Sequence, residues 1–377
     1  MARFPSLSAA GDAVPASIFA RLREHLAKFP GDVIPLQIGD THLAPPARLH
    51  DIAWQEVPAS EVYAYGAPGG WAPLVDAIVE RARARNAIDA SVGGVQIAVG
   101  ATHALSCAIQ ALCDPGDELI LLTPHWPLIK GIALAHNIVP VEVRFGDLDA
   151  LAAAITGRTA GIYYASPNNP DGEMLAPAQL AAIARLAAQR DLWIFADEVY
   201  EHYGYDAPHV SIASLDDARE RTVTVFSFAK SYAQAGLRVG YALAPERVAG
   251  AIRKLVNHSV YNVPVAMQRA ALAAMHAGEP FLAAARERYR AARDRVRAGL
   301  VAPSAVPPGG AYLWVDFSRW SGDDCMPVLE KIAAAGVLLA PGWAFGDACG
   351  AFARLCFTGV DEARLDEGIA RINAVLR

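Results

Sequence analysis

The segment SFAKSYAQAGLRVGY, residues 227–241, combines an amine with residues suited to an anion. It includes the end of the apolar run TVTVFS, so Lys230 directly follows an expected strand. A lysine among apolar residues has a depressed pKa and becomes a usable amine nucleophile, as Schiff-base chemistry requires. Gly236 lets the backbone approach a ligand, and Arg238 offers a planar fork of donors. The plainer alternative is a lysine at the solvated exit of a strand.

Ser227 and Lys230 also match S-x-x-K, the signature of serine acyl-enzymes. The companion motifs S-D-N and K-T-G do not occur in the sequence. We therefore set the acyl-enzyme hypothesis aside.

Two further strand ends carry polar side chains. Asp197, in LWIFADEVY, ends an apolar strand, where a carboxylate must cap a helix or pair with a cation. Facing a pyridinium nitrogen, it would keep that ring protonated, and Tyr200 could reach a phenolic oxygen on the same ring. Asn169 lies in SPNNPDG, which is a turn by composition, and its amide suits a phenolate-like oxygen.

An anion site is indicated where VGATHAL passes from a strand into a helix through Gly100. Exposed N–H groups at such a start attract an anion, and Thr102 adds a hydroxyl. Together with Ser227 and Arg238, this start supplies three separate contacts for one phosphate.

Two aromatic residues stand in turn-rich segments. Trp126, in TPHWPL, packs in the core by default, but the flanking prolines favour an exposed ring ready to stack on a ligand. Tyr65 lies in YAYGAPGGWAPL, a glycine-rich stretch without the G-K-[ST] ending of a phosphate loop. A nucleotide site is therefore rejected.

These residues need a sheet to bring them together. From residue 95 onward, short apolar strands alternate with helix-length segments, which predicts an α/β fold with a mainly parallel sheet covered on both faces. Ligands then lie at the carboxyl ends of the strands. After residue 245, long helices and a few strands indicate a smaller α+β domain. We expect a large domain over 46–275 and a small domain made of 1–45 and 276–377.

Composition excludes several classes of function. The 377 residues are 54% hydrophobic and 19% charged, with a net charge of −6 and no basic stripe, which argues against nucleic-acid binding. No apolar run reaches the length of a membrane span, so no membrane association is expected. Five scattered cysteines fit reduced thiols and a cytoplasmic location. No metal site is expected.

The motifs also occur together, in one order: IGD, YGAPGGWAPL, VGATHAL, DPGDELILLTPHWP, SPNNPDG, ADEVY, SFAKSYAQAGLRVGY, PGGAYLWVDF, PGWAFG and FARLCFT. In these motifs and in their order, the chain resembles the class I/II aminotransferases of the pyridoxal-phosphate (PLP) fold type I. The resemblance covers nearly the whole chain and implies a three-layer α/β fold, PLP as cofactor, and a homodimer.

The resemblance implies roles around the ring of the cofactor. Lys230 would hold PLP as an internal aldimine and then act as catalytic acid and base. Asp197 would pair with the pyridine nitrogen, while Asn169 and Tyr200 hold the ring oxygen. Trp126 would stack on the ring face.

The resemblance also implies a phosphate site and a substrate site. The phosphate would rest on Ala101, Thr102, Ser227 and Arg238, and on Tyr65 supplied by the neighbouring subunit. Arg354, in FARLCFT, would clamp the substrate carboxylate with help from Asn169 and the backbone at Gly39. Cis peptides are expected before Pro124 and Pro170.

The implied reaction moves an amino group from an α-amino acid to a 2-oxo acid. The apolar Ile38 beside Gly39, with Trp126 nearby, suggests a neutral or aromatic side chain on the substrate. A PLP-dependent lyase, oxidase or cyclase on the same fold remains an alternative, because the same motifs serve all of these reactions. A regulator of transcription on this fold would need a basic winged-helix domain for which the chain has no room.

Overall fold

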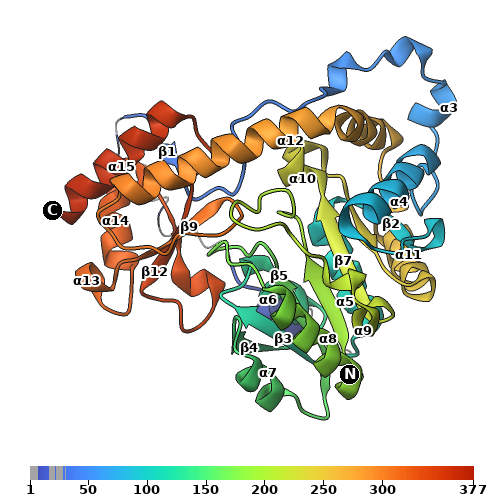
Figure 1. The fold of residues 1–377 in the computed structure, drawn as a ribbon, viewed down its shortest axis with the longest axis horizontal. Coiled ribbons are helices and arrows are strands. Elements are labelled where there is room, and N and C mark those ends of the chain that lie inside the picture. The colour runs from blue at the N-terminus through green and yellow to red at the C-terminus, as the bar shows by residue number, and fades with distance from the viewer. Residues whose placement is uncertain (1–6, 17–21, 23–28, 30) are drawn as a thin grey trace.

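The computed structural model describes residues 7–16, 22, 29 and 31–377, and its centre is a seven-stranded sheet (Figure 1). The strand order is β2-β8-β7-β6-β5-β3-β4. All neighbours are parallel except at β8, which is antiparallel to β2 and β7. The expected α/β fold with a mainly parallel sheet is confirmed. The strands are β2 (Val95–Ala98), β3 (Glu118–Thr123), β4 (Val139–Arg144), β5 (Thr159–Ala165), β6 (Trp193–Asp197), β7 (Thr222–Ser227) and β8 (Gly240–Leu243).

Helices cover both faces of this sheet, which explains why its central strands bury apolar side chains on both faces. On one face, α5, α6 and α11 pack on β3, β5, β6 and β7, and α7, α8 and α9 cover the other. The sheet is therefore the middle layer of three. These helices are α5 (Gly100–Leu112), α6 (Pro127–Ala135), α7 (Leu148–Ala154), α8 (Pro177–Arg190), α9 (Asp216–Arg219) and α11 (Glu246–Val260).

The C-terminal part forms its own core around a three-stranded antiparallel sheet of order β11-β12-β9. The N-terminal strand β1 joins this part, because it pairs in parallel with β10. The elements are β1 (Ile34–Pro35), β9 (Tyr312–Asp316), β10 (Val337–Leu338), β11 (Ala340–Pro341), β12 (Phe352–Cys356), α13 (Ser318–Ser321), α14 (Met326–Ala334) and α15 (Glu362–Leu376).

One long helix connects the two cores. Helix α12 (Val265–Gly299) contacts α4 (Ala72–Asn86) beside the large sheet and α15 in the C-terminal part (Figure 1). Its first half packs through Ala271 and Ala274, and its second half through Tyr289 and Val296. The domain boundary expected at 275/276 falls inside this helix, and that division stays a prediction. Among the described residues, the further short α-helices are α1 (Ala9–Ala13), α3 (Ala59–Val62) and α10 (Phe228–Ser231).

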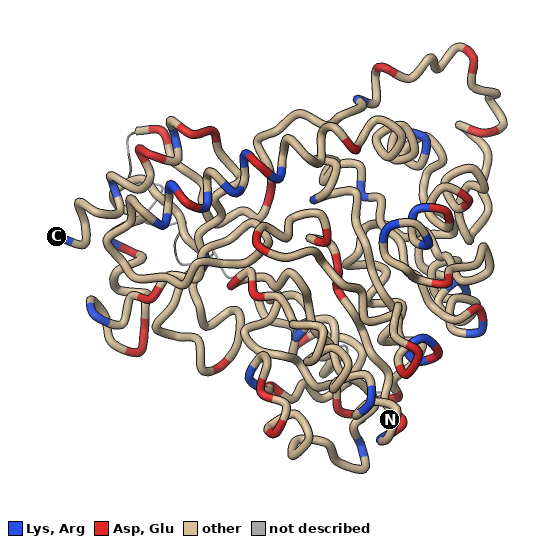
Figure 2. The backbone as a smooth tube through the Cα atoms, viewed as in Figure 1, with Lys and Arg blue, Asp and Glu red and all other residues tan. Residues whose placement is uncertain are grey.

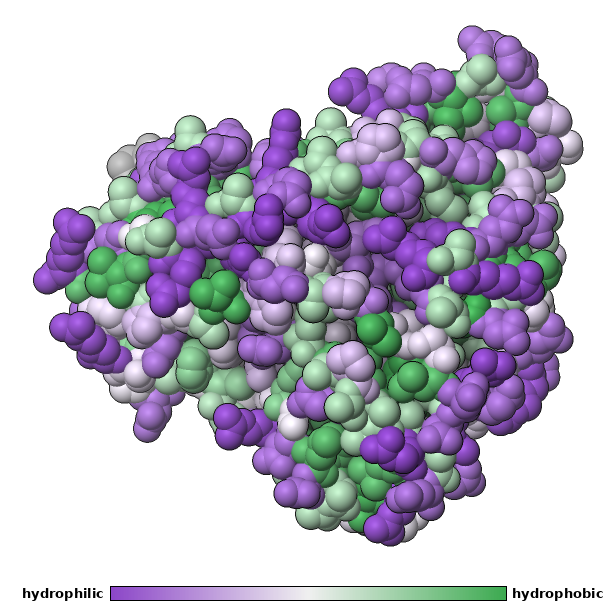
Figure 3. All heavy atoms as spheres, in the orientation of Figure 1, coloured by the Kyte–Doolittle hydropathy of each residue, from purple (hydrophilic) through white to green (hydrophobic). Residues whose placement is uncertain are grey.

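The surface is mixed in charge and polarity. Acidic and basic residues are interspersed along α12 and α15 (Figure 2), and hydrophilic residues cover most of the same face, with hydrophobic residues in separate patches (Figure 3). All five cysteines are buried and unbridged. Among the described residues, no helix is long and apolar enough to cross a membrane.

Candidate active site

A cavity of about 230 Å³ opens where β5, β6 and β7 end at Ala165, Asp197 and Ser227. Parallel strands place their carboxyl ends on one edge of a sheet, which is where such folds bind ligands. The C-terminal part closes the cavity with residues of β9 and β12. Of the site residues predicted from the sequence, the lining includes Gly39, Ala101, Thr102, Trp126, Asn169, Asp197, Tyr200, Ser227, Lys230, Arg238 and Arg354.

Lys230 lies in α10, the one-turn helix directly after β7. Ser227 caps this helix, since its Oγ accepts the backbone N–H of Ala229 at 3.1 Å. The Lys230 amine donates a hydrogen bond to the backbone oxygen of Gly39. Position 39 has no room for a larger residue, because a Cβ there would collide with the Tyr312 hydroxyl. Burial lowers the pKa of the Lys230 amine. More of this amine is therefore neutral than for an exposed lysine.

Asp197 ends β6 with its carboxylate at the cavity wall, and its side chain is buried. Its Oδ2 accepts the O–H of Tyr163 at 3.0 Å, and its Oδ1 accepts the backbone N–H of Val199 at 3.4 Å. Burial raises the pKa of Asp197 to about 6, and the two hydrogen bonds oppose that rise. Tyr163 was not predicted from the sequence.

Tyr200 meets a second tyrosine that the sequence analysis also missed. The hydroxyls of Tyr200 and Tyr312 share a hydrogen bond, and their rings lie edge to face with centroids 5.6 Å apart. Tyr312 begins β9, so it reaches the cavity from the C-terminal sheet. Burial raises the pKa of Tyr312 to about 12. Its phenol therefore stays protonated at neutral pH.

The predicted anion site lies at the start of α5. Gly100 has a φ of 77° and begins the helix, so the backbone N–H groups of Ala101 and Thr102 belong to its first turn. Arg238 reaches this helix start, since a Cβ on Gly100 would collide with its guanidinium. The absence of a side chain at Gly100 therefore makes room for the Arg238 guanidinium.

Arg354 lies in β12 and is held rigidly inside the cavity. Its Nη1 donates to Oδ1 of Asn169 at 2.8 Å, and its Nη2 donates to the backbone oxygen of Gln37 at 2.6 Å. The guanidinium lies over the rings of Tyr312 and Phe345, 4.3 and 5.1 Å from their centroids. Its Nε is buried and has no hydrogen-bond partner among the described residues. Nη1 and Nη2 each carry a second N–H, which these two bonds leave for a bound acceptor.

The loops around Trp126 and Asn169 differ in one detail from expectation. The peptide before Pro124 is cis, as predicted, but the second cis peptide precedes Pro167, so its prediction before Pro170 was wrong. Pro167 and Pro170 each follow a polar residue in the same loop, so the sequence alone does not show which of the two peptides is cis. Gly236 is also outside the lining, which contains Ala235 instead.

Two predicted residues lie away from this cavity in the same chain. Ile38 is 50% exposed and does not line it, although Gly39 does. Tyr65 is 82% exposed, and its ring lies tilted against that of Tyr261, with centroids 4.5 Å apart. Tyr65 follows α3, in a segment that projects from the rest of the chain (Figure 1).

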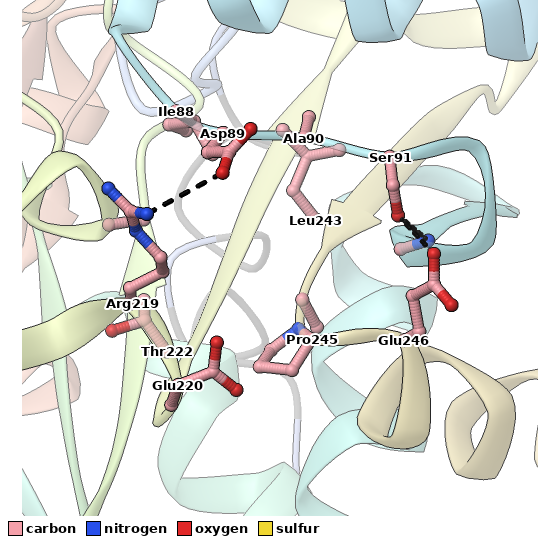
Figure 4. A pocket seen from close by; sticks show the side chains of 13 residues that line it. Ile88, Asp89, Ala90, Ser91, Arg219, Glu220, Thr222, Leu243, Pro245 and Glu246 are labelled. Carbon is pink, nitrogen blue, oxygen red and sulfur yellow. Dashed lines mark hydrogen bonds and ion pairs between the residues drawn. The ribbon is translucent and has the colours of Figure 1, made fainter. Parts of the chain in front are cut away.

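A second cavity, of about 330 Å³, lies at the opposite edge of the sheet, where β7 begins and β8 ends (Figure 4). Three of its charged groups already have a partner. Arg219 lies 3.5 Å from Asp89, and Glu246 accepts the Ser91 hydroxyl at 2.6 Å. None of the predicted site residues lines it.

Comparison with known proteins gives a consistent result. The family model described as "Aminotransferase class I and II" matches residues 31–372. An aspartate/prephenate aminotransferase of Thermus thermophilus is 33% identical over 327 residues, which cover 83% of this chain and 84% of the relative. An arginine–pyruvate transaminase of Pseudomonas aeruginosa is 33% identical over 336 residues, covering 86% and 85%.

Solved structures agree with this result. Thermus thermophilus aspartate aminotransferase with maleate superposes with a TM-score of 0.91 at 30% identity, over 99% of this chain and 100% of that chain. N-succinyldiaminopimelate aminotransferase from Mycobacterium tuberculosis gives 0.90 at 29% identity, over 98% and 100%.

Proposed function

This chain belongs to the class I and II aminotransferases, which depend on PLP, and we propose that its 230 Å³ cavity binds PLP and an α-amino acid whose amino group passes to a 2-oxo acid. One observation carries the proposal. The amine of Lys230, the carboxylate of Asp197 and the guanidinium of Arg354 line the same buried cavity. These are the groups that the cofactor's aldehyde, its ring nitrogen and the substrate carboxylate require.

The lining fits PLP at both ends of the molecule. The phosphate would lie on the first turn of α5, beside Thr102, Ser227 and Arg238, since the absence of a side chain at Gly100 lets the Arg238 guanidinium reach that turn. Asp197 would pair with the ring nitrogen at the other end of the cavity. These contacts support binding through fixed groups of the chain.

Other residues would hold the ring between these ends. The Asn169 Oδ1 already accepts from Arg354, so its amide N–H₂ remains as the donor to the ring oxygen. Tyr200 offers its hydroxyl to the same oxygen. Trp126 lines the cavity and would stack on the ring face.

Bound PLP supplies an electron-withdrawing ring, which makes the Cα–H of the substrate more acidic. The chain's own groups do the rest. Arg354 would bind the substrate carboxylate through the second N–H groups of Nη1 and Nη2 and hold the Cα in place. The Lys230 amine, more neutral because it is buried, would accept the Cα proton as general base.

We propose a donor with a neutral or aromatic side chain. The cations in the lining are Lys230, Arg238 and Arg354, and each already has a role in the scheme above. The aromatic rings of Trp126 and Tyr312 complete an environment suited to an uncharged side chain. The named relatives act on aspartate, arginine or succinyldiaminopimelate, so kinship alone does not select the donor.

We also propose a homodimer in which Tyr65 completes the phosphate site of the neighbouring subunit. Its exposure and its position beyond α3 support this role, since it does not line the cavity of its own chain. The five buried, unbridged cysteines support a reducing, cytoplasmic location.

The test is an absorbance spectrum of the PLP-loaded protein before and after single amino acids are added. We expect a visible band that an amino acid removes, with one equivalent of 2-oxo acid released per site. Phenylalanine, leucine and alanine should react faster than aspartate or glutamate. Lys230→Ala should abolish the reaction, whereas Lys254→Ala, at an exposed position of α11, should not. Release of ammonia or peroxide along with the 2-oxo acid would refute transamination, because a transaminase passes the amino group to a second 2-oxo acid and does not release it. A preference for aspartate would refute the neutral donor.

A further inference from the structure

Tyr163 and Tyr164 are neighbours on β5, and both are fully buried on opposite faces of the sheet. Tyr163 packs beneath α5 and α11, whereas Tyr164 packs beneath α8. The Tyr163 hydroxyl donates to Oδ2 of Asp197 at 3.0 Å. The Tyr164 hydroxyl has no hydrogen-bond partner among the described residues. Of this pair, Tyr163 is the one connected to the candidate active site.

The strand register explains how Tyr163 reaches a carboxylate on the next strand. Ala165 of β5 lies opposite Asp197 of β6, and Tyr163 lies opposite Phe195. Residues two apart on a strand share a face, so Tyr163 and Asp197 project toward the same side. Ala165 fills little of the space beside Asp197. Tyr163, two residues earlier on β5, has a longer side chain and therefore makes the contact with Asp197.

We propose that Tyr163 is a positioning residue for transamination: its O–H holds one carboxylate oxygen of Asp197 and thereby fixes the orientation of that carboxylate toward the ring nitrogen of bound PLP. The inference rests on the role of Asp197 in the proposed function. Tyr163 does not line the cavity itself, so it acts through Asp197.

The chemistry of the pair suits this role. Burial, with Asp197 adding to it, raises the pKa of the Tyr163 phenol well above its usual value, so the phenol remains a donor throughout the working range of pH. Burial also disfavours the ionised form of Asp197, and the hydrogen bond from Tyr163 opposes this effect. Without that donor, the described contacts leave Asp197 with the 3.4 Å bond from the backbone of Val199. The carboxylate then loses both orientation and support for its charge.

Tyr163→Phe tests the inference, with Tyr164→Phe as the matched control on the same strand. PLP is titrated into the apo forms, and its Kd is read from the change in absorbance. Tyr163→Phe should raise this Kd roughly tenfold, because a hydrogen bond to a charged group is lost. Its kcat should fall while the KM for the amino acid stays unchanged, since Arg354 is not affected. Tyr164→Phe, which removes an unpaired hydroxyl, should change neither.

A second background separates positioning from a general effect on packing. In Asp197→Ala, adding Tyr163→Phe should change the PLP Kd by less than about twofold, because the residue through which Tyr163 acts is gone. This background also removes the buried charge, so the measurement remains possible if Tyr163→Phe alone folds poorly. An equal effect in both backgrounds, or equal behaviour of Tyr163→Phe and Tyr164→Phe, would overturn the inference.

The two proposals fail in different ways. If the unmodified protein neither binds PLP nor releases 2-oxo acid from an amino acid, the proposed function is wrong. If it does both, and Asp197→Ala weakens PLP binding while Tyr163→Phe has no effect, the function stands and the role of Tyr163 is refuted.

Discussion

Arg354 of the C-terminal sheet donates a hydrogen bond to Asn169 of the large sheet's edge, with 2.8 Å between Nη1 and Oδ1. The bond joins residues 185 positions apart in the chain. It fixes the guanidinium beside the residue expected to hold the cofactor's ring oxygen. Substrate clamp and cofactor site are thus connected by one direct contact.

Arg354→Lys should weaken substrate binding far more than cofactor binding. Lysine keeps the charge but not the planar fork, which bonds Asn169 and Gln37 and still has a second N–H on each terminal nitrogen for the substrate. We expect the KM for the donor amino acid to rise about 10- to 100-fold, as for one or two lost charged hydrogen bonds. The PLP Kd measured without amino acid should remain within about twofold, because Arg354 is assigned no cofactor contact.

The control for this substitution is Arg295→Lys. Arg295 pairs with Glu362 and Asp366 on the surface, away from the cavity. Steady-state kinetics should be unaltered there. An unchanged KM in Arg354→Lys would assign the substrate carboxylate to another group.

Gly100→Ala should damage the phosphate site. The φ of 77° is unfavourable for alanine, and the added methyl would displace the Arg238 guanidinium. We expect the PLP Kd to rise roughly tenfold through the loss of one charged contact. Equilibrium titration of the apo protein measures it.

Gly250→Ala in α11 is the matched control, since a Cβ there meets no atom within 4 Å. It should leave the PLP Kd unchanged and stabilise the protein by about 0.5–1 kcal/mol, because alanine favours the helix. Equal PLP affinity in the two variants would argue against a phosphate at the start of α5.

Mixed dimers can show which subunit uses Tyr65. Tyr65→Phe alone should weaken PLP binding, and Lys230→Ala alone should be inactive. A dimer of one Tyr65→Phe chain and one Lys230→Ala chain then has one site with both Lys230 and Tyr65, provided that Tyr65 crosses the interface. We expect that site to have the PLP affinity of the unmodified protein, measured after separation of differently tagged dimers. No recovery would place Tyr65 in the site of its own chain.

A buried ion pair predicts how stability depends on pH. Arg81 donates to Glu201 at 2.6 Å, and both side chains are nearly inaccessible. Burial alone would raise the pKa of Glu201, but Arg81 and the neighbouring His202 lower it to about 2. Because this folded-state value is depressed, the pair's stabilisation is complete above about pH 4.5, the unfolded value, and is lost as pH falls toward 2.

Arg81→Gln should therefore destabilise the protein by about 3–5 kcal/mol at pH 7, since it leaves a buried carboxylate unpaired. The difference from the unmodified protein should shrink at pH 3. Urea unfolding at fixed protein concentration measures both values, with the exposed Arg295→Gln as control. A difference independent of pH would show that the Glu201 charge is not what Arg81 stabilises.

The sequence predicted the part of the site that parallel strands assemble. Asp197 and Lys230 each follow a buried apolar strand, and such strands bring their ends to one edge of the sheet. The position of Asp197 and Lys230 at or just after the ends of their strands was therefore enough to predict that both lie at the same edge of the sheet.

The sequence did not predict contacts that depend on register or on packing between sheets. Tyr163 reads as one more apolar residue of a buried strand, and its contact with Asp197 follows from the pairing of β5 with β6. Tyr312 reaches Tyr200 from a sheet 112 residues further along the chain. Ile38 was expected in the pocket beside Gly39, but successive residues need not face the same way.

Helix α12 contains Pro280, which has no backbone N–H, so the carbonyl of His276 lacks its usual helical donor. This turn lies between the half of α12 that packs beside the large sheet and the half that packs in the C-terminal part. The helix is therefore held by one backbone hydrogen bond fewer at this turn than an uninterrupted helix would have. Arg354 and Tyr312 follow this turn in the chain and Lys230 precedes it, so a bend of α12 at Pro280 would move the two sides of the cavity relative to each other.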